Sequence, residues 1–486
     1  VRWVETRNEN LMAMTQGRAQ IHHIKLGGDR EGHIKAYRLD VVQDSGAYPS
    51  MGAVLPFMTR MMTTGVYEIG HVEFNATSVV TTTTPLVAYR GAGRPEAAAA
   101  LERMVDIYAT EIGLDPAGVR RRNFLPPDVF PYTTPTGTEY DSGDYARALD
   151  LVLATADYDG LRAEQAARRA AGDPRLLGIG VAAYVEVTGG GAEYGEVQLR
   201  PDGSVLVKTG SNPYGQGHHT AWAMLVHDRL GIPMERIEVV HGDTDLIPSG
   251  AVTGGSRSVQ LAGAAVHDAA GKLLELARER AADLLEAAPE DVVLDAAEGR
   301  FHVAGTPAIA LGWEELGVEG APPLAGLSDL ADAKATFPFG AHVAVVEVDR
   351  DTGAVELRRI VAVDDAGVIL NPMLAEGQVH GGLAQGAAQA LFEEVRYDED
   401  GNPLTATFAD YTIVSAPELP MFERVTMETP TPLNALGAKG IGESGTIGST
   451  PAVHNAVIDA LSHLGVRHLD MPLTPEKIWR AIGDAG

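Results

Sequence analysis

The sequence contains no cysteine among its 486 residues. This absence excludes disulfides, cysteine nucleophiles, zinc–thiolate sites and iron–sulfur clusters ligated by this chain. A redox metal would have to be bound by other atoms or arrive inside a cofactor. The sequence also lacks an apolar run of membrane-spanning length, and its first residues show no signal-peptide pattern. We therefore expect no membrane span and a cytoplasmic location.

Basic residues are scarce: 38 Lys and Arg stand against 66 Asp and Glu, for a net charge of −28. Such an acidic surface argues against nucleic acid or an anionic membrane as a partner. Aromatic residues make up only 6% of the chain, whereas glycine is abundant at 55 residues, which favours tight turns and close backbone approaches. The chain is longer than one hydrophobic core serves, so we expect two or more domains. It starts at Val1 within "VRWVETRNENL", and we expect that upstream residues are missing.

Strand-like and helix-like segments alternate throughout the chain, which predicts an α+β fold of two mixed α/β domains. We place the boundary after a helical pair, giving domains at 1–172 and 173–486. Residues 95–113 predict a helix, with proline in its first turn and glycine after its end. Other expected features are hairpins at 192–211 and 342–367, a loop or surface excursion at 320–340, and a solvated helix end or partner contact at Arg120–Arg122.

Five glycine-rich stretches precede or enter predicted helices: 89–97, 211–220, 251–260, 375–386 and 437–451. Helix starts present unpaired N–H groups and a dipole that favours negative charge. The stretches match neither GxxxxGK[ST] nor a convincing GxGxxG unit. Together they predict a large anionic cofactor with many polar edges. The alternative is that these glycines merely allow helices and strands to pack closely.

Five motifs then carry a resemblance to a known family: "VAYRGAGRPEAAAALERMVD", "YGQGHHT", "TGGSRSVQLAGAA", "VDDAGVILNPMLAEGQVHGGLAQGAAQAL" and "GAKGIGESG". In this order they resemble the molybdopterin-binding large subunit of the xanthine oxidase family of molybdenum hydroxylases. Within that family, the sequence is most similar to aerobic carbon monoxide dehydrogenase large subunits of the form II type, which carry AYRGAGR. The likeness covers essentially the whole chain.

The resemblance implies two large mixed α/β molybdopterin-binding domains, with the family's N-terminal domain missing. It implies a molybdenum–molybdopterin cofactor, in bacteria often the cytosine dinucleotide. It places no Fe–S cluster or FAD on this chain. These groups would belong to a medium FAD-binding subunit and a small [2Fe–2S] subunit, assembled as a dimer of heterotrimers.

By motif match, Glu443 corresponds to the family's active-site glutamate, the general base of the hydroxylation. A carboxylate desolvated in such a site is expected to have a raised pKa. The alternative is that Glu443 is a helix-approach acid paired with Lys439. Arg90 matches an arginine that orients substrate in purine-oxidising members, with a mere loop anchor as the alternative. The residues matched to cofactor contacts are Gln216, Gly217, His218, Thr253, Gly254, Gly255, Ser256, Arg257, Ser258, Gln385, Lys439, Gly440 and Gly442. No metal ligand is assigned to the chain.

One departure bears on the substrate. Form I carbon monoxide dehydrogenases carry a copper-binding cysteine after the loop arginine, whereas this chain reads Arg90-Gly91-Ala92-Gly93-Arg94. The sequence therefore predicts hydroxylation of an aldehyde or N-heteroaromatic carbon. Three alternatives stay open: carbon monoxide dehydrogenase-type activity, a non-catalytic truncated fragment, and an unrelated nucleotide-binding α/β enzyme.

Overall fold

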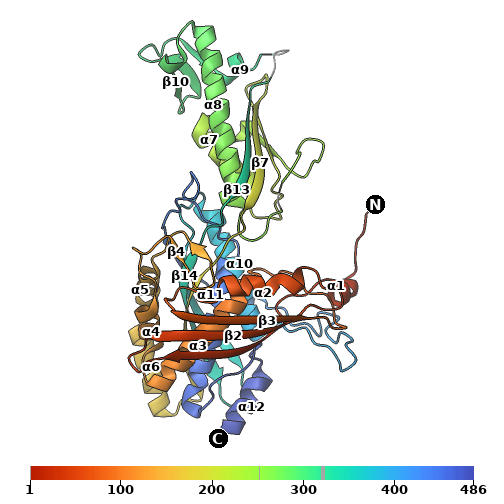
Figure 1. Ribbon diagram of the computed structural model, residues 1–486, viewed down its shortest axis with the longest axis vertical. Helices are drawn as coiled ribbons and strands as arrows, with labels where there is room; N and C mark the ends of the chain where they lie inside the picture. The colour runs from red at the N-terminus through yellow and green to blue at the C-terminus, as the bar shows by residue number, and fades with distance from the viewer. Residues whose placement is uncertain (1, 251, 319–322, 486) are drawn as a thin grey trace.

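The computed structural model describes residues 2–250, 252–318 and 323–485. The chain forms two lobes stacked along its long axis (Figure 1). The segment from β7 (Gly191–Leu199) to β13 (Ala325–Ala333) builds the narrow upper lobe, and the segments before and after it build the broad lower lobe. The polypeptide therefore crosses the junction between the lobes in both directions.

A four-stranded sheet in the order β16-β15-β14-β6 forms the centre of the lower lobe. Its strands are β6 (Arg175–Val185), β14 (Phe339–Asp349), β15 (Val355–Asp365) and β16 (Glu423–Met427). β14 pairs antiparallel with both β6 and β15, which confirms the predicted hairpin at 342–367. β14 is buried along almost its whole length, as expected for a strand covered on both faces.

The long helix α11 (Ser444–Leu461) lies against this sheet, and a second long helix, α10 (Pro372–Leu391), packs against α11. The stretch 375–386 was predicted to precede or enter a helix, and it lies inside α10. A Cβ at Gly382 would lie 2.9 Å from the Cα of Gly445, so glycine permits close helix contact there. At Gly382, the alternative that glycine allows close packing is therefore correct.

A second sheet, in the order β1-β2-β3, lies at the front of the lower lobe (Figure 1). It consists of β1 (Gln20–Gly28), β2 (Ile34–Asp44) and β3 (His71–Val79), with α2 (Met51–Met61) between the last two in the chain. Alternate residues of β2 are buried, the period expected of a strand with one face on the core. The predicted helix at 95–113 is confirmed as α3 (Arg94–Ile112), which ends at Gly113 with φ 72°.

The arginine run at the end of α4 (Pro116–Asn123) departs from expectation. Arg120 is 0% exposed, so this end of the helix is not simply solvated. Its Nε donates to Glu102 over 2.8 Å and its Nη1 to Asp106 over 2.6 Å, both on α3. The pairing explains how a guanidinium can be buried, because both its charge and its donors are satisfied.

The upper lobe contains a four-stranded sheet in the order β13-β7-β8-β9. β7 and β8 (Val205–Thr209) are antiparallel, which confirms the predicted hairpin at 192–211. Two helices, α7 (His218–Leu230) and α8 (Ala264–Leu285), pack on the sheet. The loop expected at 320–340 is partly wrong, because β13 pairs with β7 along that stretch; residues 320–322 lie outside the described residues.

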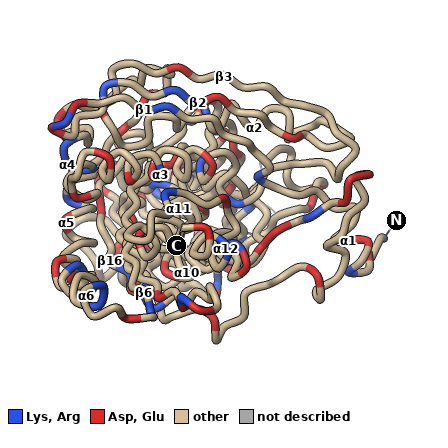
Figure 2. The backbone as a smooth tube through the Cα atoms, turned by 90° about the horizontal axis from the view of Figure 1, so that it is seen from below, with Lys and Arg blue, Asp and Glu red and all other residues tan. Residues whose placement is uncertain are grey.

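The remaining elements are α1 (Arg7–Ala13), β4 (Tyr132–Thr133), β5 (Glu139–Tyr140), α5 (Tyr145–Ala156), α6 (Tyr158–Ala171), β9 (Ile237–Val240), β10 (Val292–Asp295), β11 (Arg300–Val303), β12 (Ala310–Gly312), α9 (Trp313–Leu316) and α12 (Pro475–Ala485). The predicted domain boundary falls between α6 and β6 and stays a prediction. Acidic and basic positions are interspersed on the face seen in Figure 2. Within the described ranges, no helix is both long enough and apolar enough to cross a bilayer.

Candidate active site

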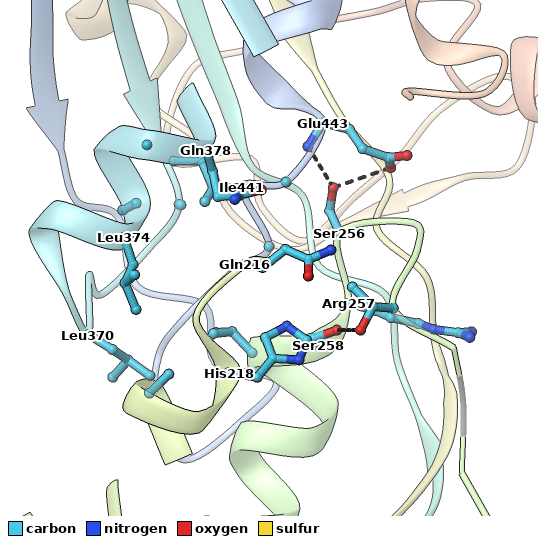
Figure 3. Close-up of a pocket in the computed structure, with 18 of the residues that line it drawn as sticks. Gln216, His218, Ser256, Arg257, Ser258, Leu370, Leu374, Gln378, Ile441 and Glu443 are labelled. Carbon is cyan, nitrogen blue, oxygen red and sulfur yellow. Dashed lines mark hydrogen bonds between the residues drawn. The ribbon is translucent and has the colours of Figure 1, made fainter. Parts of the chain in front are cut away.

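Glu443 occupies the position directly before the first residue of α11, where the loop 437–443 enters the helix. Its backbone N–H donates to Ser256 Oγ over 3.0 Å, and the same hydroxyl donates to the Glu443 carboxylate over 3.2 Å. Figure 3 shows Ser256 bridging both parts of Glu443. One serine of the upper lobe thus fixes the orientation of a carboxylate that belongs to the lower lobe.

The Glu443 carboxylate is also held by the loop before α3. The backbone N–H of Gly91 donates to its Oε1 over 3.0 Å, and the Arg94 guanidinium forms a short ion pair with its Oε2. Burial alone would raise the pKa of Glu443, but Arg94 and the Gly91 N–H stabilise the charged form and bring the pKa below its usual value. The expected raised pKa is therefore wrong, because a partner charge outweighs desolvation.

A second carboxyl group, that of Glu186, contacts the same Arg94 guanidinium. The sequence motifs assigned no role to Glu186. Arg94 Nη2 lies 3.3 Å from Glu186 Oε1, and Ser444 Oγ donates to Glu186 Oε2 over 2.8 Å. Glu186 is 0% exposed. Burial raises its pKa to about 7, with Arg94 opposing and Glu443 adding to the shift. An acid directly after the apolar, buried strand β6 was the signal that could have found it.

Arg90 makes the contacts of a loop anchor. Its Nε donates to the carbonyl of Gly442 over 2.6 Å, and its Nη2 to the carbonyl of Gln378 over 3.0 Å. Its Nη1 donates to Gln385 Oε1 over 2.9 Å. These bonds tie the residue before Glu443 to α10. A role for Arg90 in orienting substrate stays a prediction.

A cavity of about 620 Å³ opens between the lobes beside Glu443. Its walls come from the loop before α7, the loop before α8, the start of α10 and the loop 439–443. The predicted residues that line it are Arg90, Gln216, His218, Thr253, Gly254, Gly255, Ser256, Arg257, Ser258, Lys439, Gly440, Gly442 and Glu443. Arg90, from the loop before α3, and residues 366–371, after β15, complete the lining, so segments widely separated in sequence converge on one hollow.

Two predicted residues lie behind the cavity wall instead. Gly217 directly precedes α7 with φ 83°, and a Cβ there would lie 2.5 Å from the side chain of Leu374. Gln385 lies on α10 and accepts the hydrogen bond from Arg90. Both residues support the wall, and direct cofactor contact by either stays a prediction.

Lys439 contributes to the wall, but its ammonium is held by the core. Its Nζ lies 5.0 Å from the ring centroid of Phe339 and 3.8 Å from Asp365 Oδ1. Burial lowers the pKa of this lysine, while Asp365 opposes the shift. The alternative pairing of Lys439 with Glu443 is therefore wrong, since the lysine faces a different carboxylate.

The cavity lining suits an anionic, polar group. The backbone N–H groups of Gly440, Ile441 and Gly442 make no hydrogen bond to the residues that the structure describes. Among the same residues, His218 Nδ1 is buried without a hydrogen-bond partner. Unpaired donors that are oriented in advance are what a buried anion requires. The donor set is thus the one expected for phosphate and pterin edges.

The loop 253–258 is tied to both lobes. It continues into a π-helical turn at Val259–Gly263 that leads directly into α8. Within this turn, Gln260 donates to Thr188 Oγ1 over 2.8 Å and to the carbonyl of Gly189 over 2.9 Å. Such turns occur often at functional sites. The side chain of Arg257 points away from the hollow (Figure 3).

Comparison with known sequences identifies the family. Sequence profiles described as "Molybdopterin cofactor-binding domain" match residues 151–420 and 1–124. The chain belongs to the xanthine oxidase family of molybdopterin-binding proteins. This membership rules out the alternative of an unrelated nucleotide-binding enzyme. Among the described residues of this molybdopterin-binding chain, no group of three or more His, Asp or Glu could hold a metal ion.

The relatives share nearly all of this molybdopterin-binding chain. The carbon monoxide dehydrogenase large chain of Hydrogenophaga pseudoflava is 39% identical over 99% of the chain. A structure of Cu,Mo-CO dehydrogenase matches 100% of the chain with a TM-score of 0.93 at 35% identity. Quinoline 2-oxidoreductase from Pseudomonas putida 86 matches 99% with a TM-score of 0.92 at 34% identity. The chain spans 63%, 64% and 64% of these three proteins, respectively.

Proposed function

We propose that this chain is the catalytic, molybdopterin-binding large subunit of a molybdenum hydroxylase. The observation that carries the proposal is the position of Glu443. It is an oriented, charged carboxylate at the edge of a cavity whose lining also includes the backbone N–H groups at 440–442, hydroxyl groups and apolar side chains such as Leu370 and Leu374. A carboxylate that is ionised and lines a cofactor cavity is suited to accept a proton.

In this proposal, the loops 214–218, 253–258 and 439–442 hold a molybdenum–molybdopterin cofactor, as the cytosine dinucleotide. The cofactor supplies two-electron oxidation of a substrate carbon, with the oxygen taken from water. The chain supplies the rest. N–H groups at 440–442 and the ring of His218 bind the cofactor's polar edges, and Glu443 takes up the proton released in the reaction.

The electrons then leave to partner chains, because this chain has no cysteine to ligate an iron–sulfur cluster. We propose a small [2Fe–2S] subunit and a medium FAD-binding subunit, assembled with this chain as a dimer of heterotrimers in the cytoplasm. The relative from Hydrogenophaga pseudoflava is named as the large chain of a carbon monoxide dehydrogenase, which supports an arrangement with further subunits.

The proposed substrate is an aldehyde or an N-heteroaromatic compound. A cysteine after Arg90 would stand at position 91, where the backbone has φ 101° and a Cβ would lie 2.4 Å from Pro95 Cγ. A side chain does not fit there without a backbone shift, so the loop is unsuited to a copper-binding cysteine. Similarity to quinoline 2-oxidoreductase supports a heteroaromatic substrate. Robust oxidation of carbon monoxide by the purified complex would overturn this assignment in favour of the second candidate function.

The first experiment is elemental analysis for molybdenum together with acid-released CMP. It uses the chain co-expressed with its partner subunits. Near-stoichiometric molybdenum and CMP are the expected result. Folded protein with neither would favour the alternative of a non-catalytic fragment. Molybdenum without CMP would keep the family cofactor but overturn the dinucleotide form.

A further inference from the structure

Two buried carboxyl groups share one guanidinium beside the cavity. Arg94 is 2% exposed and contacts Glu443 with one side of its Nη2 and Glu186, 3.3 Å away, with the other. The side chain of Glu443 is 14% exposed, whereas that of Glu186 is fully enclosed. The positive charge of Arg94 is therefore shared by two carboxyl groups, and of these two only Glu443 lines the cavity.

The surroundings of the two carboxyl groups differ. Glu443 accepts from the Gly91 N–H and from Ser256 Oγ in addition to Arg94. Glu186 accepts from Ser444 Oγ and from the more distant Nη2 of Arg94. Like charges this close disfavour simultaneous ionisation, so the less stabilised group keeps a proton. Glu186 is that group, because its side chain is fully enclosed and its contact with Arg94 is the longer of the two.

Charged and titratable groups from four parts of the fold lie near Glu186. Arg94 lies on α3, Arg90 on the loop before α3, and Glu443 directly before α11. Tyr184 lies on the preceding strand, with its hydroxyl bonded to Asp364. Ser256 and Ser444 are the neutral groups that contact it. Among the described residues, the balance that decides its protonation is therefore Arg94 against Glu443.

We propose that Glu186 is a positioning residue that sets the proton affinity of Glu443: once Glu186 is ionised, Arg94 is divided between two carboxylates, and Glu443 becomes the stronger base. The proposal rests on the proposed function, in which Glu443 accepts the proton of the reaction. When Glu186 ionises, its proton goes to solvent. During turnover, Glu443 accepts a different proton, the one released in the reaction. Glu186 itself touches neither substrate nor cofactor.

The consequence is a dependence of turnover on pH near 7, where burial places the pKa of Glu186. Below this pH, Glu186 is neutral and Arg94 stabilises the negative charge of Glu443 alone, so Glu443 is a weak base. Above it, Glu186 is charged, and kcat rises while KM is unchanged. A change of one or two units in the pKa of the base corresponds to roughly three- to ten-fold in kcat.

The test compares the wild-type complex with Glu186→Gln, which mimics the protonated group permanently. At about pH 6 the two should have equal kcat. At about pH 8.5 the variant should be roughly three- to ten-fold slower, with unchanged KM and molybdenum content. A merely structural role would lower kcat equally at both pH values. A constant ratio across this range would therefore overturn the proposal.

Ser444→Ala is the second variant. The Ser444 hydroxyl bonds the charged form of Glu186 and lowers its pKa, so its removal should move the inflection in kcat to higher pH. An inflection that does not move would contradict the assignment to Glu186.

An infrared measurement is independent of turnover. The C=O stretch of a protonated carboxyl group should titrate near pH 7 in the wild-type protein and be absent from Glu186→Gln. Its absence from the wild type would overturn the carboxyl pair, even in an active enzyme. A titrating band in a complex without molybdenum or turnover would support the pair while the proposed function failed. The two failures are thus distinguishable.

Discussion

The backbone N–H of Gly91 lies 3.0 Å from the carboxylate of Glu443, although 352 positions separate the two residues. The contact joins the loop before α3 to the loop before α11. It gives a carboxylate at the cavity edge a fixed donor that cannot leave without moving the backbone. Charge and orientation of Glu443 thus come from backbone geometry as well as from Arg94.

Glu443→Gln is expected to remove the proton acceptor while keeping the size of the side chain. Turnover should fall by about 10²- to 10⁴-fold, the usual contribution of a general base. Molybdenum content should stay at the wild-type level, because the N–H groups at 440–442 are unchanged. Glu399→Gln, at an exposed position, is the matched control and should be as active as the wild type. Unchanged turnover of the Glu443 variant would refute the base assignment.

Gly440→Ala is expected to open the cavity wall. A Cβ at Gly440 would lie 1.4 Å from the carbonyl oxygen of Ser256, so the loops 253–258 and 439–443 could not keep their contact. Molybdenum and CMP occupancy should drop strongly. Gly483→Ala, in α12 with no atom within 4 Å of the added Cβ, is the control and should leave occupancy intact. Full occupancy in Gly440→Ala would show that the loops can separate without loss of the cofactor.

His218→Phe tests the unpaired imidazole nitrogen in the cavity. The His218 ring packs against Trp222 with centroids 5.1 Å apart, and phenylalanine keeps that packing while removing Nδ1. We expect lower molybdenum and CMP occupancy at an unchanged unfolding temperature. His219→Phe, at the exposed neighbouring position outside the cavity, is the control. Equal occupancy in both variants would mean that His218 does not contact the cofactor.

Arg94→Met is expected to leave two buried carboxyl groups without their counter-charge. Removing one partner of a buried ion pair costs about 3–5 kcal/mol of the free energy of unfolding. Urea unfolding at neutral pH measures the loss. The double variant Arg94→Met with Glu186→Gln should recover part of it, because one of the two stranded charges is then absent. Additive losses would show that Arg94 and Glu186 do not interact.

The free energy of unfolding should depend on pH through Glu186. Its pKa is raised in the folded protein from 4.5 to about 7, so the unfolded chain gives up this proton more readily. The stabilising contribution is complete below pH 4.5 and is lost as pH rises to about 7. Glu186→Gln removes this loss and should therefore be less sensitive to pH over the same window. Parallel stability curves for both proteins would contradict the raised pKa.

The local elements followed from local sequence. Proline in the first turn and glycine after the end predicted α3, and alternating residues around short turns predicted both hairpins. These signals concern neighbouring residues only. For the stretch 375–386 the sequence left open whether the glycines serve ligand binding or packing, because glycines that let α10 approach α11 look in the sequence like glycines of a loop.

The site itself was predictable only in part. The five motifs contain Glu443 and most of the predicted residues that line the cavity, because these motifs follow one another along the chain in the order of the family. Arg94 lay inside a quoted motif without an assigned role, and Glu186 directly follows the strand β6. Their importance depends on a shared contact across 92 positions, which no local pattern contains.

The sequence by itself determined which chemistry is available to this protein. Without cysteine it has no thiolate to ligate an iron–sulfur cluster, and its glycine-rich segments let the backbone approach an anionic cofactor closely. Only the tertiary structure decided how the acids behave. Burial raises the pKa of both Glu186 and Glu443, yet the closer approach of Arg94 and the Gly91 N–H to Glu443 reverses its shift. Electrostatic energies depend on distance and solvent access, and folding sets both.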